Sequence, residues 1–143
     1  MFMRISLRPA LLALGASVAL FGAAIPVAAH DGAERVKLNF KQPITNLPGK
    51  SLVAVEVDYP PGAASLPHAH AKSAFIYAYV VSGAVESQVN DGPKRVHRAG
   101  ESFFEEPGAI HGVSRNASKT RPAKLLAVFV VDSNDMELTA PLK

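Results

Sequence analysis

Apolar and polar residues alternate with a period of two along several short segments that begin after Glu34. The alternation covers residues 36–40 and 53–58, where Val, Leu and Phe are separated by charged, polar or small residues. Because successive side chains of a strand point to opposite faces, this pattern predicts half-buried strands. Two continuous apolar runs, residues 75–81 and 125–131, are long enough for strands that are buried on both faces.

Turn-favouring residues separate these segments at short intervals. Glycine follows proline, serine or alanine at residues 61–62, 82–83, 99–100 and 107–108. The residues Asn90-Asp91-Gly92 lie between two strand-like segments and predict a hairpin. No segment beyond residue 30 has the period of an amphipathic helix. Roughly eight or nine short strands at this spacing predict one all-β domain, a sandwich or a barrel.

The first 30 residues differ in composition from the rest of the chain. Arg4 and Arg8 precede an uncharged run that extends to His30. A basic start, an apolar stretch and small residues at positions 27–29 are typical of a secretory signal peptide. We therefore expect residues 1–29 to be removed and residues 30–143 to be exported to a bacterial periplasm. The run is also long enough for a retained membrane anchor, but Pro26 favours cleavage.

Composition and charge exclude several classes of function. The 143 residues contain no cysteine, which excludes disulfides, thiolate metal sites and a cysteine nucleophile. Without the two arginines of the leader, 13 basic residues face 12 acidic ones. A nearly neutral domain carries no electrostatic footprint for nucleic acid, so we expect no nucleic-acid partner. No second apolar run is long enough to span a membrane after cleavage.

Three histidines stand where strands could bring them together. His68 and His70 are two residues apart and therefore share one face of a strand. His111 follows a Pro-Gly turn near the start of another predicted strand. Neutral imidazoles are common metal ligands, and such a pair with one distant histidine can form a metal site. The pair alone also occurs on surface strands, so its spacing leaves both interpretations open.

The positions of these histidines and of nearby glycines resemble the two sequence motifs of the cupin superfamily. The first segment contains Gly62, His68-Ala69-His70 and Gly83, and the second contains Gly100, Pro107-Gly108, His111 and Asn116. The resemblance covers roughly residues 52–131, which is most of the expected mature chain. It implies an all-β fold with a single cupin barrel, of the double-stranded β-helix or jelly-roll type, over residues 30–143.

The resemblance also implies a ligand set and a quaternary state. In cupins, the histidines that match His68, His70 and His111 bind a divalent transition metal inside the barrel. Iron, manganese, nickel, copper and zinc all remain open for this chain. Many single-domain cupins pair through edge strands, so a homodimer is expected, with residues 36–40 and 136–142 as possible exchange arms. A small organic molecule is the expected ligand or substrate.

The chain departs from the family pattern at the fourth ligand, which is usually a glutamate after the histidine pair. Counting from the two ends of the motif places that position at Ala74 or at Ile76, and neither can ligate. Three outcomes are open: a three-histidine site, a carboxylate supplied from the second motif, or a site without metal. Of the adjacent Glu105 and Glu106, we expect Glu105 to point inward as a distant ligand or general base. Both could also be solvated acids beside a turn.

Two predictions concern side chains outside this site. On a regular strand Tyr77 and Tyr79 lie on the face opposite Ile76, so we expect them outside the barrel. His97 is expected on the surface of the hairpin.

The function is open between three classes. The first is an exported metal cupin that acts as an oxygenase, isomerase or lyase on a small molecule, with Glu105 as the catalytic carboxylate. The second is a non-catalytic module that binds a small molecule or a metal. The third is a structural protein in which the histidines are only pocket residues. The missing glutamate argues against oxalate-type chemistry, and the fold alone selects no reaction.

Overall fold

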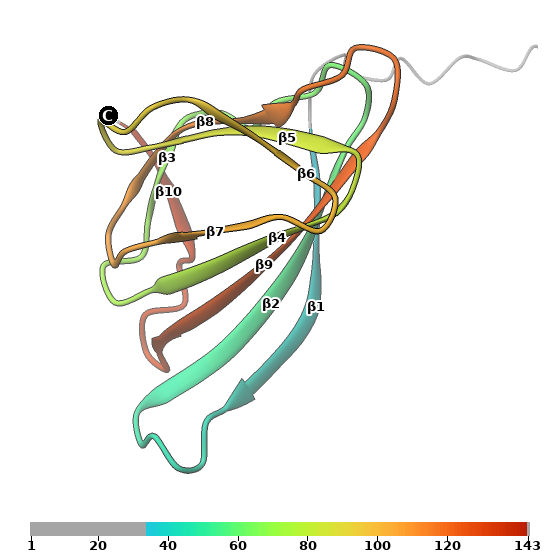
Figure 1. The fold of residues 1–143 in the computed structure, drawn as a ribbon. Helices are drawn as coiled ribbons and strands as arrows, with labels where there is room; N and C mark the ends of the chain where they lie inside the picture. Colours follow the sequence, from blue (N-terminus) through green and yellow to red (C-terminus); the bar gives the residue numbers. More distant parts are fainter. Residues whose placement is uncertain (1–33, 143) are drawn as a thin grey trace, which may run out of the picture.

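The computed structural model describes residues 34–142 and contains ten β-strands and no helix in that range (Figure 1). The strands are β1 (Arg35–Pro43), β2 (Lys50–Tyr59), β3 (His68–His70), β4 (Phe75–Ser82), β5 (Ala84–Val89), β6 (Arg95–Arg98), β7 (Ser102–Glu105), β8 (Ile110–Asn116), β9 (Ala123–Asp132) and β10 (Thr139–Pro141). The signal peptide expected over residues 1–29 lies outside the described residues, and export stays a prediction. Within residues 34–142, nothing helical is long and apolar enough to cross a membrane.

The strands form two antiparallel sheets that face each other. Sheet I has the order β1-β2-β9-β4-β7, and sheet II has the order β10-β3-β8-β5-β6. Figure 1 shows sheet II above and the longer strands of sheet I below. Non-consecutive neighbours in both sheets mean that the chain crosses repeatedly between them, as in a jelly roll. The predicted all-β fold is confirmed.

Strands β4 and β9 are buried on one face only, so the prediction of burial on both faces was wrong. In β4, Ile76 and Ala78 are each 1% exposed, whereas Phe75 and Tyr77 are 40% and 46% exposed. Strand β9 alternates between buried and half-buried positions in the same way. Sheet II covers the inner face of sheet I, and no described segment covers the outer face. The apolar outer residues therefore lie at the surface.

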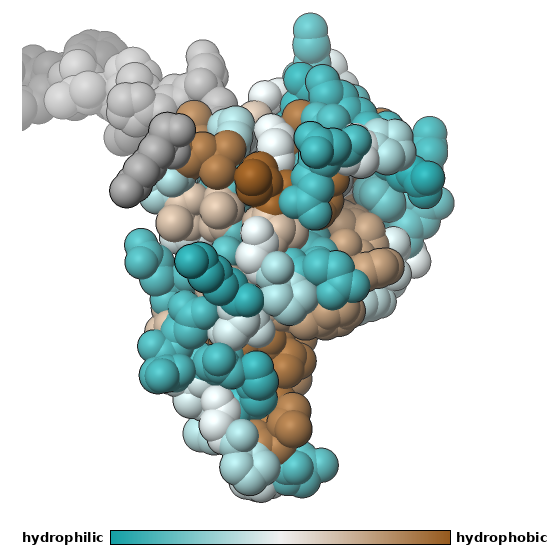
Figure 2. Space-filling model, turned by 90° about the vertical axis from the view of Figure 1, so that its left-hand side faces the viewer, coloured by the Kyte–Doolittle hydropathy of each residue, from teal (hydrophilic) through white to brown (hydrophobic). Residues whose placement is uncertain are grey.

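Strand β1 was predicted to be half-buried, but it is exposed on both faces. Val36, Leu38 and Phe40 are 61%, 57% and 47% exposed. The reason is that β1 is an edge strand, which pairs with β2 alone among the described strands and lies at the far side of sheet I from β4 and β7 (Figure 1). Figure 2 shows brown, hydrophobic residues reaching the surface in the lower half of the molecule, where β1 and β2 lie in Figure 1. The homodimer stays a prediction.

The C-terminal segment packs on its own chain. Strand β10 pairs with β3, and its Thr139 lies opposite His70 in the register. Met136 and Leu138, which precede β10, pack against the hydrophobic core. This segment was considered as an exchange arm, but in the structure it completes sheet II of the same chain.

Two tight turns determine how β4, β5 and β6 follow one another in the fold. The predicted hairpin at Asn90-Asp91-Gly92 joins β5 to β6, and Asn90 adopts a φ of 50°, as such turns require. Gly83 is the single residue between β4 of sheet I and β5 of sheet II, and its φ is 72°. A Cβ atom on Gly83 would lie 2.5 Å from the carbonyl oxygen of Pro122. Glycine is therefore needed here for both conformation and space.

We expect Gly83→Ala to destabilise the protein much more than Gly100→Ala. Gly100 also has a positive φ, of 90°, but a Cβ there meets nothing within 4 Å. Gly100→Ala should lower the free energy of unfolding by about 1–2 kcal/mol through backbone strain alone. Gly83→Ala should cost at least about 2 kcal/mol more, because the strand crossing must shift away from Pro122. Urea unfolding of both variants measures the difference, and equal losses would contradict this account.

Candidate metal centre

Strands β3 and β8 of sheet II bring the three predicted histidines together. His68 lies directly opposite His111 in the register, and His70 shares the face of His68 because it is two residues further along β3. One ring nitrogen from each residue lies within 4.8 Å of the others. His70 and His111 are 8% and 4% exposed, and His68 is half-buried. The clustering expected from the spacing is present.

Backbone carbonyls orient two of the imidazoles. The Nδ1 atom of His68 lies 2.8 Å from the carbonyl oxygen of Leu66, and Nδ1 of His70 lies 3.3 Å from that of Leu138. A carbonyl oxygen only accepts hydrogen bonds, so each Nδ1 carries the proton and donates it. In this tautomer the lone pair lies on Nε2, which is the atom that can ligate a metal. Metal-binding histidines in proteins are usually held by such contacts.

Ser87 of β5 performs the corresponding role for His111. Its hydroxyl oxygen lies 2.8 Å from Nε2 of His111 in a buried contact. When the Ser87 hydroxyl accepts a hydrogen bond from Nε2–H of His111, the lone pair of Nδ1 faces Glu105. Burial lowers the pKa of His111 to about 4, although the nearby Glu105 opposes the shift. The ring is therefore neutral at pH 7, as a metal ligand must be.

Glu105 enters the site from sheet I, at the end of β7. It is 3% exposed, whereas the neighbouring Glu106 is exposed, so the expected inward orientation is confirmed. Its Oε2 atom lies 3.1 Å from Nε2 of His70, and its Oε1 atom lies 3.3 Å from Nδ1 of His111. The carboxylate thus contacts the imidazoles and is not a distant group. It lies opposite Ile76 in the register, next to a position where the motif glutamate is missing.

The contact between His70 and Glu105 needs a proton or a metal cation between its two atoms. Nε2 of His70 and Oε2 of Glu105 are both buried, and neither has a hydrogen-bond partner among the described residues. Burial raises the pKa of Glu105, but a hydrogen bond from protonated His70 and the positive charges of the imidazoles when protonated outweigh this effect, so the pKa lies below its ordinary value. When His70 is neutral, the carboxylate instead faces the lone pair of Nε2 at 3.1 Å. A divalent metal between these atoms would satisfy both, so the donor set fits such an ion.

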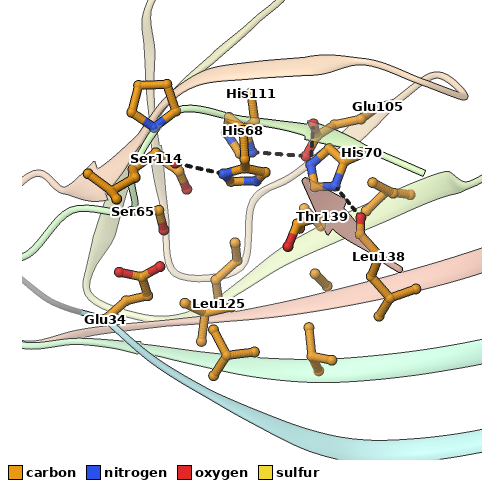
Figure 3. Close-up of a pocket in the computed structure, with 18 of the residues that line it drawn as sticks. Glu34, Ser65, His68, His70, Glu105, His111, Ser114, Leu125, Leu138 and Thr139 are labelled. Atoms are coloured by element: carbon orange, nitrogen blue, oxygen red, sulfur yellow. Dashed lines mark hydrogen bonds and ion pairs between the residues drawn. The ribbon is translucent and has the colours of Figure 1, made fainter. Parts of the chain in front are cut away.

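One cavity connects these four residues with the interior of the barrel. Its volume is about 870 Å³, and His68, His70, His111 and Glu105 form part of its wall. Figure 3 shows the imidazoles and Glu105 along the upper side, with Leu125 on the opposite side. A ligand in this cavity could therefore contact an ion held by the four side chains.

Sequence reasoning missed a second polar group in the same cavity. The hydroxyl of Tyr59 lies 2.9 Å from the Ser65 hydroxyl and 2.7 Å from the Ser114 hydroxyl, and all three residues line the cavity. On a regular strand, Ser114 would point away from the face of His111. The pairing of β5 with β8 is irregular here, and the register passes over Gly112. The irregularity turns both His111 and Ser114 inward.

The remaining side chains singled out in the sequence lie outside the site. Tyr77 is 46% exposed and Tyr79 is half-buried, both opposite the inward Ile76, as predicted. His97 was expected at the surface, but it is half-buried because its ring packs against that of Phe103, with the two ring centroids 4.7 Å apart. This burial lowers the pKa of His97.

Comparison with known proteins identifies the class of this chain. Residues 55–129, which are more than half of the chain, match the family model described as the Cupin domain. The chain belongs to the cupin superfamily.

Solved structures show the same fold. An uncharacterised conserved protein with a double-stranded β-helix domain from Klebsiella pneumoniae is 19% identical, with a TM-score of 0.58 over 72% of this chain and 81% of that one. KdgF from Halomonas sp. is 25% identical, with a TM-score of 0.56 over 73% and 84% of the two chains. An oxalate oxidase is 23% identical, with a TM-score of 0.57 over 72% and 53%. None of the curated proteins compared with this chain matches it significantly.

Asn116, which matches the asparagine that closes the second cupin motif, stabilises the fold through buried hydrogen bonds. It is 5% exposed, and its amide nitrogen lies 2.7–3.1 Å from three backbone carbonyl oxygens, those of Tyr59, Pro60 and Arg121. Its side-chain oxygen accepts a hydrogen bond from the backbone N–H of Ser118. One side chain thus ties the end of β8 to the end of β2.

Asn116→Ala should lower the free energy of unfolding by about 2–4 kcal/mol, because it leaves several buried backbone groups without partners. The matched control is Asn39→Ala, which removes one exposed hydrogen bond to Glu56 and should cost less than about 1 kcal/mol. Urea unfolding measures both values. Similar losses for the two variants would show that Asn116 has no special role in the fold.

Proposed function

We propose that this cupin binds one divalent transition-metal ion through His68, His70, His111 and Glu105, and acts as a metalloenzyme on a small organic molecule. The observation that carries the proposal is a pair of buried atoms, Nε2 of His70 and Oε2 of Glu105, which face each other at 3.1 Å and have no hydrogen-bond partner among the described residues. Both atoms are donors of the kind that such ions bind. The candidate ions are iron, manganese, nickel, copper and zinc.

The four side chains would hold the ion at the wall of the cavity. Three imidazoles and one carboxylate leave positions open toward the cavity, and in this state the ion would supply Lewis-acid chemistry. The protein's own contribution is orientation: the carbonyls of Leu66 and Leu138 fix two rings. Burial of His70, His111 and Glu105 limits the access of bulk water to these three donors.

A non-catalytic binding module is the second candidate. The observation that favours it is the scarcity of groups for acid–base chemistry. Apart from the histidines, the described residues that line the cavity include only two carboxylates, Glu34 and Glu105. If Glu105 is a metal ligand, it is not free to act as a general base. Absence of bound metal would leave only the binding module, whereas turnover of a substrate by the metal-loaded protein would favour the enzyme.

We expect about one transition-metal ion per chain in protein purified without added metal. The double variant His68→Ala/His111→Ala should contain none while remaining folded, because it removes two of the four donors. Elemental analysis gives the stoichiometry, and circular dichroism checks the fold. A metal-free native protein that no candidate ion can reconstitute would overturn the metalloenzyme and leave the binding module. Full occupancy in the double variant would place the metal elsewhere.

Glu105→Gln should weaken metal binding by at least about tenfold, because it removes the only carboxylate from the donor set. Glu106→Gln is the matched control, since Glu106 is adjacent but exposed, and it should leave the affinity unchanged. Competition with a chromophoric chelator measures both affinities. If the two variants behave alike, the ion is held by the three histidines alone.

A further inference from the structure

The cavity beside the histidines has a floor that is almost entirely apolar. The floor is the inner face of sheet I, opposite the imidazoles (Figure 3). Its side chains come from β2, β4 and β9: Val55, Val57, Ala78, Leu125, Ala127 and Phe129. A volume of about 870 Å³ lies in the range of sites that take up whole organic ligands. An apolar floor of this kind favours a ligand with an apolar body, because contact removes hydrocarbon from water on both sides.

The side chains at the centre of the floor are small. Ala127 of β9 pairs with Val55 of β2 on one side and with Ala78 of β4 on the other. These three residues form a row across sheet I. On β9 the larger Leu125 and Phe129 flank the row, two residues away on the same face. The row therefore leaves room for a flat or branched hydrocarbon group between the two larger side chains.

The charges around the cavity disfavour anionic ligands. Among the described residues, its lining includes the carboxylates of Glu34 and Glu105 and no lysine or arginine. A ligand with two negative charges would have to leave water without a lysine or arginine to pair with. Small dicarboxylates therefore have no partner here except the histidines or an ion bound to them, beside the carboxylate of Glu105, whereas a neutral ligand meets no such penalty.

A neutral polar group lies at the side of the cavity away from Glu105. Figure 3 shows Ser65 and Ser114 at one end and Glu105 with His70 at the other. The Tyr59 hydroxyl joins those of Ser65 and Ser114 through two hydrogen bonds. Three hydroxyls have three protons, and two bonds use two of them, so one proton remains to be donated to a ligand. Burial raises the pKa of Tyr59, which keeps the phenol neutral.

We propose that the cavity selects a neutral, mainly apolar molecule whose oxygen donors face the histidine–glutamate cluster and whose hydrocarbon body lies on the row Val55–Ala127–Ala78. This inference deepens the proposed function, because it names the class of ligand for the same site. Its central part, the preference for an apolar and uncharged body, depends on the floor and the charges alone and does not require a metal.

Three probes test separately how the hydrocarbon body and the negative charge of a ligand affect its binding. 2,3-Dihydroxynaphthalene has an apolar body and two neutral hydroxyls, naphthalene-2,3-dicarboxylate has the same body with two negative charges, and oxalate has the charges without the body. Isothermal titration calorimetry with the metal-free protein at pH 6.5 should show binding of the diol at least tenfold tighter than of the dicarboxylate. Oxalate should not bind measurably. Addition of zinc should tighten binding of the diol further.

Ala127→Leu tests the location of the body. It fills the middle of the row, so binding of the diol to the metal-free protein should fall by at least tenfold. The matched control is Val128→Leu, the next residue of β9, which lies on the opposite face and is half-buried. This control should bind the diol as the native protein does. Metal stoichiometry should be the same in both variants, because neither residue belongs to the donor set.

The outcomes distinguish this inference from the proposed function. The inference would be overturned if oxalate or the dicarboxylate bound to the metal-free protein as tightly as the diol does. Equal diol affinities for Ala127→Leu and Val128→Leu would also overturn it, because the body would then lie elsewhere. If no ion binds at the histidines but the diol binds and Ala127→Leu weakens it, the cavity inference stands and the metalloenzyme falls.

Discussion

A carboxylate buried against imidazoles between two apolar sheets is the constraint on which the rest of the site depends. Taking an ionised carboxylate out of water is costly unless a partner compensates it. In this cupin Nδ1 of His70 donates a hydrogen bond to the carbonyl of Leu138, so the nearest partner of the carboxylate, Nε2, carries a lone pair when the ring is neutral. The Leu138 carbonyl belongs to the segment that leads into β10. The closure of sheet II by β10 therefore also fixes which nitrogen of His70 faces Glu105.

Glu105 can supply the carboxylate of the site because it lies on the strand next to the position where the motif glutamate is missing. The motif glutamate would stand at Ala74 or Ile76, and Ile76 is paired with Glu105 of β7. Side chains at paired positions project from the same face of a sheet about 5 Å apart. A carboxylate moved from β4 to β7 is therefore displaced by only one strand spacing, and the length of a glutamate side chain can compensate for much of that shift. Ile76 then contributes to the apolar wall instead.

The sequence predicted those features that depend on the period of a strand. The pair His68 and His70, the inward Glu105 and the hairpin at Asn90 all follow from alternation or from local turn chemistry. Features that depend on tertiary neighbours could not be predicted in this way. Burial on one face of β4 and exposure of β1 depend on which surfaces sheet II covers, and local alternation does not encode this.

Two parts of the site have no signal in a single sequence. The carbonyls that orient His68 and His70 come from Leu66 and Leu138, and every residue has a carbonyl. The inward position of Ser114 depends on the irregular register at Gly112, which reverses the parity on which the alternation argument depends. Strand periodicity thus identifies candidate ligands, whereas the contacts that orient them emerge only from the fold.

The donor set is divided between the two sheets, and this division connects the site to the fold. His68, His70 and His111 belong to β3 and β8 of sheet II, and Glu105 belongs to β7 of sheet I. An ion held by all four would link the sheets across the core, because each sheet supplies part of its coordination. Without a cation, the same atoms bring a lone pair and a carboxylate into a buried contact. Binding of an ion and packing of the two sheets would therefore be coupled, and the free energy of one would contribute to the other.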